Sequence, residues 1–243
     1  MAKAQEKFKI ELDTEQMAQA GLHFGHRTSK THPKMNPYLH GVRNNVHIID
    51  LEKTKEKLIQ ALKYVQDLTS EGKVLLLVGT KIQTQDLVRK TAEECGLPYV
   101  AERWLGGTFT NFGTILKRIE YYKDLEKKKA EGGFEKYTKK ERAEFDEELK
   151  ELERKFGGIK NLHHLPEAIF VCDMRKDGIA VKEAKMKGVK VIGICDTNVD
   201  PSLADFPIPA SDDAISSVKY ILDKVKEAIQ SAEIKDKNEK KEQ

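Results

Sequence analysis

Apolar positions along this chain alternate between helical spacing and short continuous runs. Leu58, Leu62 and Val65 recur every three or four residues, which predicts a helix over about 52–70, and the apolar run at 73–78 is typical of a strand covered on both faces. The same alternation predicts helices at about 83–95, 179–187 and 214–231, and strands at about 47–49, 99–100, 168–172 and 190–194. Strands that alternate with helices predict an α/β domain with a parallel sheet and flanking helices.

One long stretch, 111–158, does not fit a single crossover between two strands. Its two arms carry apolar residues at heptad-like steps of three and four: Phe112, Ile115, Ile119, Tyr122 and Leu125 in the first, and Phe145, Leu149, Leu152 and Phe156 in the second. With Gly132-Gly133 between the arms, this spacing predicts an antiparallel coiled-coil helical hairpin. We therefore expect a discontinuous α/β domain over 1–110 and 159–231, a hairpin insertion over 111–158 and a disordered polar tail over 232–243.

Composition narrows the possible classes of protein. The chain has 43 Lys and Arg against 40 Asp and Glu, and its net charge of +3 is too small to indicate a nucleic-acid partner by itself. Cys95, Cys172 and Cys195 lack C-x-x-C spacing, so we expect reduced, buried thiols in a cytosolic protein. No apolar run approaches the ~20 residues of a spanning helix, and the first residues lack the apolar core of a signal peptide. We therefore expect a protein that is neither secreted nor embedded in a membrane.

The segment Gly21–Asn45 departs from this balance of charge. It contains Arg27, Lys30, Lys34 and Arg43, four of the seven histidines and no Asp or Glu, so its local charge is +4. Guanidinium and ammonium groups pair with phosphate oxygens, and flat side-chain rings stack on unpaired bases. The segment is therefore predicted to be a basic loop that binds structured RNA. The alternative is an ordinary surface loop whose histidines satisfy backbone carbonyls.

Two of these histidines, His23 and His26, lie three residues apart, a spacing that metal ligands use on a helix. Gly21 and Gly25 disfavour a helix there, and no third ligand is evident nearby. We therefore expect no metal ion and no cofactor.

A second candidate contact lies at 103–111, just before the hairpin. It combines the only Trp, Trp104, with Arg103, adjacent glycines and a polar run that ends at Asn111. Either Trp104 takes part in a shaped contact with RNA, or it packs as a core anchor beside a glycine turn. In both cases Arg103 and Asn111 remain candidates to face phosphates.

Polar residues that follow the predicted strands offer an enzymatic alternative. Residues 78–81, VGTK, resemble a phosphate-binding turn but lack the full G-x-x-x-x-G-K-[ST] spacing. Asp173, Asp196 and Asp200 could hold a magnesium ion at the carboxyl edge of the sheet, yet they also suit helix caps and Asx turns. Because no catalytic constellation can be specified from spacing, the enzyme interpretation rests on fold analogy alone. A third alternative is a protein adaptor that uses the hairpin alone.

Seven strings follow one another along nearly the whole chain. They are GLHFGHRTSKTHPKMNPYLHGVRNNVHIIDLEKT, LLLVGTK, RWLGGTFTNF, GGIK, PEAIFVCD, VKEAKMKGVKVIGICDTNVDP and SDDAI. Each string is weak alone, but in this order they resemble the S-two (S2) family of small-subunit ribosomal proteins. The resemblance implies a flavodoxin-like (Rossmann-like) parallel sheet with an inserted coiled-coil hairpin, and no catalytic activity.

The same resemblance implies a set of partners. Family members lie between the head and body of the small subunit and touch its ribosomal RNA through the N-terminal region and the hairpin. They neighbour other small-subunit ribosomal proteins, and bacterial members help to recruit the largest of these. The hairpin and a chain start without a transit signal resemble the bacterial type, in cytoplasmic ribosomes, with an organelle-encoded version as the alternative. Neither a membrane nor a small-molecule substrate is expected as a partner.

The family's RNA-facing motif can be carried onto this chain residue by residue. It falls on His23, Phe24, Gly25, His26, Arg27, Lys34, Arg43 and Asn44, and a second basic motif falls on Arg103 and Trp104. This chain has Thr31-His32 before Pro33, where many relatives carry an aromatic residue. Stacking on RNA at that position is therefore not expected here.

Overall fold

The computed structural model describes residues 10–239, which form two compact units. The first unit contains the described residues up to Lys73, together with Cys172–Arg175 and the residues from Ile192 onward. The second contains Val74–Val171 and Lys176–Val191. Among the described residues, no helix combines the length and the apolar character that crossing a membrane requires.

Five strands form one parallel sheet, in the order β5-β4-β6-β7-β8. They are β4 (Leu75–Val78), β5 (Tyr99–Val100), β6 (Ala168–Val171), β7 (Lys190–Cys195) and β8 (Phe206–Pro209). Every residue of β4 and β6 is buried, as expected for strands covered on both faces. The predicted α/β class and parallel sheet are thus confirmed. The sequence did not indicate β8, because its two prolines lack backbone donors and restrict a strand to an edge of the sheet, where β8 lies.

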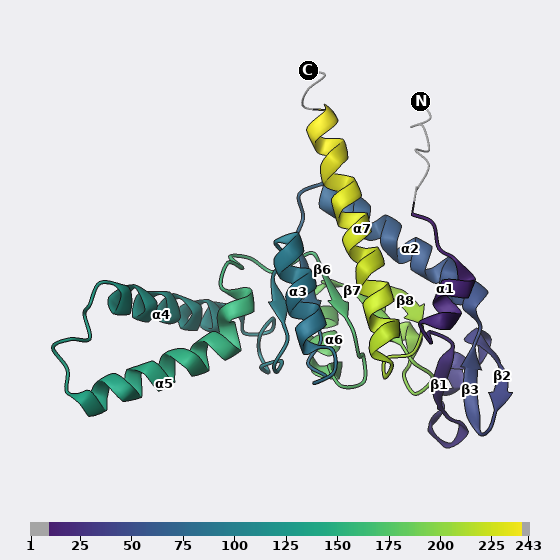
Figure 1. Ribbon diagram of the computed structural model, residues 1–243, viewed down its shortest axis with the longest axis horizontal. Coiled ribbons are helices and arrows are strands. Elements are labelled where there is room, and N and C mark those ends of the chain that lie inside the picture. Colours follow the sequence, from purple (N-terminus) through teal and green to yellow (C-terminus); the bar gives the residue numbers. More distant parts are fainter. Residues whose placement is uncertain (1–9, 240–243) are drawn as a thin grey trace. The chain divides into compact units, whose positions relative to one another are not determined.

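In the first unit, α2 (Leu51–Ser70) and α7 (Ile215–Glu239) lie side by side (Figure 1). The apolar stripe predicted for α2 is buried, and Leu58, Leu62 and Val65 are fully inaccessible to solvent. α7 continues past the expected helix end at Ser231, so the predicted tail at 232–243 begins inside a helix. Lys and Glu are good helix formers and no Gly or Pro follows Ser231, so nothing ends the helix there. Residues 240–243 lie outside the described part.

The first unit also contains a small antiparallel sheet, in the order β1-β3-β2. Its strands are β1 (Phe24–Arg27), β2 (Leu39–Arg43) and β3 (Val46–Ile49). Two expectations are corrected here: the basic segment is a pair of strands rather than a loop, and the strand at 47–49 lies outside the parallel sheet. Asn44 and Asn45 join β2 to β3 with φ of 50° and 62°, the left-handed conformation of a tight hairpin turn that asparagine tolerates.

Short helices connect these elements in the first unit. α1 (Thr14–Gln19) begins after Asp13, whose carboxylate accepts a hydrogen bond from the backbone N–H of Glu15. Three-residue to six-residue 3-10 helices follow, η1 (Thr28–Lys30) and η2 (Pro33–Tyr38) between β1 and β2, and η4 (Pro201–Leu203) after β7.

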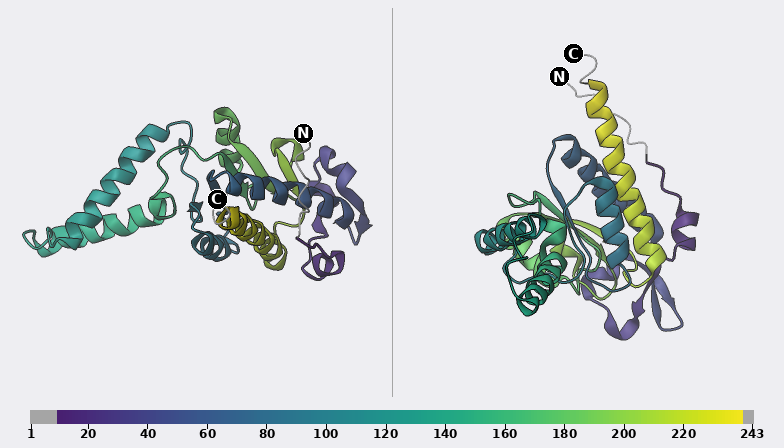
Figure 2. Two further views of the ribbon diagram at one scale, coloured as in Figure 1. Left: turned by 90° about the horizontal axis from the view of Figure 1, so that it is seen from above. Right: turned by 60° about the vertical axis from the view of Figure 1, so that its left-hand side comes forward.

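The second unit carries α3 (Gln85–Cys95), α6 (Gly178–Lys187) and the predicted hairpin. The hairpin consists of α4 (Phe112–Ala130) and α5 (Lys139–Phe156), followed by η3 (Gly157–Ile159), and its helices run side by side in opposite directions (Figure 1 and Figure 2). Polar contacts between them include the Tyr121 hydroxyl, which donates to Glu148 over 3.0 Å, and Lys129, which pairs with Asp146 at 2.7 Å. The supercoil of a true coiled coil stays a prediction.

Candidate nucleic-acid interface

β1 is held against the residues that follow β7. A Cβ atom on Gly25 would lie 2.4 Å from Cγ2 of Thr197, so only glycine permits this approach. The backbone N–H of His26 donates to Oγ1 of Thr197 over 2.9 Å, and that of His32 donates to the carbonyl of Thr197 over 2.7 Å. The basic segment therefore has a fixed backbone, anchored at the carboxyl end of β7.

The side chain of His26 lies between two carboxylates of the same unit, the buried Asp196 and the exposed Asp213. Its Nδ1 lies 3.1 Å from Oδ2 of Asp196, and its Nε2 lies 3.4 Å from Oδ2 of Asp213. The Asp196 carboxylate, by hydrogen bonding and by charge, raises the pKa of His26 despite the opposing effect of burial. His26 thus ties β1 to the residues after β7 and offers little of its charge to an outside partner.

The same place brings together ligand atoms that could hold a divalent cation. Donor atoms of His26, Asp196 and Asp212 all lie within 4.8 Å of one another, and the two aspartates are buried. Imidazole nitrogen and carboxylate oxygen are ordinary ligands of such ions. The sequence offers no third ligand near His23 and His26; the fold supplies two ligands from residues far along the chain, and His23 is not in the group.

Lys34 is also engaged within the first unit. Its ammonium group donates to Oδ2 of Asp200 over 2.7 Å and to Oγ of Ser202 over 2.9 Å. The hydrogen bond from Lys34 holds the pKa of Asp200 well below its usual range. Lys34 therefore fixes the position of η2 against the residues that follow β7.

Three cations of the segment remain uncompensated. Arg27, Lys30 and Arg43 are exposed, and their side chains form no ion pair with another described residue. Beside them Phe24 is 51% exposed, with its ring centroid 3.9 Å from that of His23. Guanidinium forks together with an exposed ring are the groups that meet phosphates and unstacked bases. Asn44, at the exposed turn next to Arg43, completes this surface.

The second predicted contact is organised by one buried carboxylate. Glu183, on α6 and 6% exposed, accepts hydrogen bonds from the backbone N–H groups of Gly107 (2.7 Å), Phe109 (2.9 Å) and Thr110 (3.0 Å). Burial alone would raise the pKa of Glu183, but these backbone donors outweigh it and hold the pKa below its usual value. The sequence gives no sign of this role, because a glutamate on a charged helix is typical of a solvated face.

Trp104 lies in the core of the second unit. It is 6% exposed, its indole N–H donates to Glu183 over 3.3 Å, and its ring meets Phe109 edge-on at 4.9 Å between centroids. The structure thus matches the core-anchor alternative for Trp104. Arg103 and Asn111, on either side of the anchored loop, are exposed.

The polar groups at the strand ends, which the enzymatic alternative would use, make hydrogen bonds within the protein. After β4, the backbone N–H and the hydroxyl of Thr80 donate to the buried Asp177 carboxylate over 3.2 and 2.7 Å. An intramolecular anion therefore occupies the place where a phosphate would meet this turn. Asp173 accepts from the backbone N–H of Arg175 over 2.9 Å, and Asp200 accepts from that of Ser202 over 2.9 Å, as in caps and turns.

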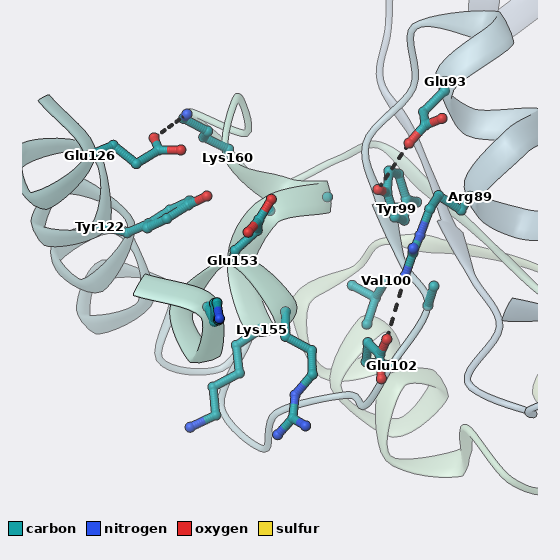
Figure 3. Close-up of a pocket in the computed structure, with 15 residues that line it drawn as sticks. Arg89, Glu93, Tyr99, Val100, Glu102, Tyr122, Glu126, Glu153, Lys155 and Lys160 are labelled. Carbon is teal, nitrogen blue, oxygen red and sulfur yellow. Dashed lines mark hydrogen bonds and ion pairs between the residues drawn. The ribbon is translucent and has the colours of Figure 1, made fainter. Parts of the chain in front are cut away.

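A cavity of about 510 Å³ lies in the second unit at the base of the hairpin (Figure 3). Its lining carries charges of both signs, and several are paired with each other: Lys160 with Glu126, and Arg89 with Glu102 at 3.4 Å. A Cβ atom on Gly158 would lie 2.2 Å from the carbonyl oxygen of Tyr99, so the hairpin base packs directly on β5. The paired lining indicates a structural joint for the hairpin rather than a site for one kind of ligand.

Comparisons with known proteins bear on these surfaces. The family model described as "Ribosomal protein S2" matches residues 17–232. A curated relative from Coprothermobacter proteolyticus, named "Small ribosomal subunit protein uS2", is 45% identical over 214 residues, which cover 88% of this chain and 80% of the relative. The matched region includes both predicted RNA-facing motifs and the whole hairpin.

Proposed function

The chain belongs to the ribosomal protein S2 family and is of the bacterial type, and on this basis we propose that it binds small-subunit ribosomal RNA through the exposed cations of β1, η1 and β2. Membership makes it a structural protein of the small ribosomal subunit, and nothing in the family indicates a catalytic activity.

One observation carries the proposal: within a segment without acidic residues, ion pairs engage some basic side chains and leave others unpaired among the described residues. His26 and Lys34 meet Asp196 and Asp200 and fix the backbone, whereas Arg27 and Arg43 project without a partner among the described residues. Cations held on a rigid scaffold lose little conformational entropy when they meet phosphates. Phosphate contacts of this kind position a protein on RNA without reading its sequence.

We extend the RNA surface to the second unit through the loop that Glu183 organises. Arg103 and Asn111 are its exposed contacts, and Trp104 contributes by anchoring the loop. The family resemblance supports the remaining parts of the proposal: a place between head and body, neighbouring small-subunit proteins as partners, assistance in recruiting the largest of them, and a cytoplasmic location within the ribosome.

A charge-reversal experiment tests the RNA contact. Each phosphate contact contributes about −0.7 to −0.9 to the slope of log affinity against log salt concentration. An Arg27→Glu/Arg43→Glu chain is therefore expected to bind a small-subunit ribosomal RNA transcript more weakly, with a slope that is shallower by roughly 1.5. Both residues are exposed, so the fold should persist.

The matched control is Lys187→Glu/Lys219→Glu, which changes the net charge equally at exposed positions outside the proposed surface. It should weaken binding only through the long-range field and should leave the slope nearly unchanged. Equal slopes for the two variants would show that the affinity follows net charge, and the assignment of β1 and β2 to RNA would then be withdrawn.

A further inference from the structure

The second unit has a cleft at the carboxyl ends of β4 and β6, from which the RNA-binding proposal uses only Arg103 as an exposed contact. It has a volume of about 390 Å³ and lies between the turn after β4 and the start of α6. Its lining residues are Thr80, Ile82, Gln85, Glu102, Arg103, Trp104, Lys176, Asp177 and Ile179. Carboxyl ends of strands in an open α/β sheet are a common place for binding.

Two isoleucines in this lining are unusually exposed. Ile82, before α3, is 81% exposed, and Ile179, in the first turn of α6, is 57% exposed. Single exposed apolar residues are ordinary, but two from separate elements beside one cleft form a patch of the kind that marks a protein interface. Removing both from water on binding would favour association, because apolar surface leaves the solvent.

The acidic groups of the cleft have internal partners, so the rim of the cleft is positively charged. Asp177 accepts both hydrogen bonds from Thr80, and Glu102 pairs with Arg89 at 3.4 Å, so both acids have internal partners. Arg103 is exposed and forms no ion pair with another described residue. A carboxylate is the matching partner for a free guanidinium beside an apolar patch, because it accepts two parallel hydrogen bonds.

We propose that this cleft binds a segment of a neighbouring protein that carries an apolar side chain next to an Asp or Glu. The apolar side chain would lie between Ile82 and Ile179, and the carboxylate would pair with Arg103. RNA fits the two isoleucines less well, because bases stack on aromatic rings rather than on aliphatic side chains, and Trp104 is buried. This partner is additional to the proposed RNA contact, and Arg103 is the one residue that the two surfaces share.

Site-specific photo-crosslinking in assembled subunits tests the proposal. The photoreactive residue p-benzoylphenylalanine replaces Ile82 or Ile179, one at a time, in the full chain, and small subunits containing it are purified, irradiated, digested with nuclease and analysed by mass spectrometry. Both exposed positions tolerate the change without disturbing the core. Both are expected to crosslink to one protein segment that contains an apolar residue adjacent to Asp or Glu.

Two further chains make the result specific. Adding Arg103→Glu should lower the yield of that crosslink several-fold, because a like charge then faces the carboxylate. The probe at Met186, which is 74% exposed on the same helix but outside the cleft, should not reach the segment. Crosslinks to RNA, no crosslink from either isoleucine position, or the same segment captured from position 186 would each overturn the proposal. None of these outcomes depends on the salt slope that tests Arg27 and Arg43, so the two proposals fail separately.

Discussion

Replacing Glu183 with glutamine removes one acceptor from a carboxylate that serves five donors. Oε1 accepts from the Gly107 N–H and the Trp104 indole, and Oε2 accepts from the N–H of Phe109 and from the N–H and hydroxyl of Thr110. An amide keeps one oxygen and presents an NH₂ group in place of the other. Whichever way the amide turns, at least two donors then face another donor.

The size of the effect follows from those donors. A buried donor left without an acceptor costs about 1–3 kcal/mol, so two of them predict a loss of about 2–6 kcal/mol in the free energy of unfolding. That is a large share of the ~5–15 kcal/mol that holds a typical domain. Because the damage lies in the loop at 104–110, Arg103 and Asn111 should also lose their fixed positions and contribute less to RNA affinity.

The stability lost on replacing Glu183 with glutamine should depend on pH in a defined direction. The pKa of Glu183 is held below its usual value, so its carboxylate contributes stability that is present above the unfolded pKa of about 4.3 and is lost as pH falls through the lower, folded pKa. Glutamine does not titrate. The stability difference between the two chains should therefore be constant near neutral pH and shrink in the acid range, as Glu183 takes up a proton.

Urea unfolding at several pH values, followed by the fluorescence of Trp104, the only tryptophan, measures the stability difference between the two chains directly. Trp104 touches the site and is buried, so its signal reports the loop as well as the global transition. Glu120→Gln, at an exposed position, is the control and should change stability by less than about 0.5 kcal/mol. A difference below about 1 kcal/mol for Glu183→Gln, or one that stays constant into the acid range, would refute this account of the loop.

Two glycine substitutions test close contacts, one in each unit. Gly25→Ala places a Cβ atom 2.4 Å from Cγ2 of Thr197, so β1 must move. Thermal unfolding should show that the free energy of unfolding falls by about 1–3 kcal/mol, and RNA binding should be weaker. Unchanged stability would contradict the packing described. Gly158→Ala places a Cβ atom 2.2 Å from the Tyr99 carbonyl and should destabilise the second unit comparably, whereas Gly113→Ala, with nothing within 4 Å, should be neutral or stabilising in the same assay.

Periodicity predicted the elements whose burial is one-sided or complete. The stripe of α2 and the apolar run of β4 were both found at their expected positions, because burial in these elements follows the chain's own repeat. β1 and β2 were not predicted, since their few residues mix Gly, His and Arg without alternation. Their one local signal was the Asn44-Asn45 pair, which suits a hairpin turn with positive φ.

The candidate site was predictable in composition but not in geometry. Counting charges gave the basic segment +4 and treated its cations as equivalent. Contacts across roughly 170 positions of sequence distinguish these side chains: Lys34 meets Asp200, unlike the other three cations, and His26 meets Asp196. Only the fold brings these carboxylates to β1 and η2, so no local pattern could have shown which cations stay exposed.

Buried carboxylates near the strand ends are consistent with the proposal that a chain of small net charge presents a defined surface to RNA. Asp177 and Glu183 occupy backbone donors of the second unit that could otherwise attract phosphate, and Asp196 engages the histidine that anchors β1. Each buried carboxylate thus occupies a donor or a basic side chain that could otherwise bind an external anion. It also fixes the segment beside it. In the proposed RNA contact, the surface is then set by the cations that remain, Arg27 and Arg43 among them. Their number, rather than the net charge of +3, should set the salt dependence of binding.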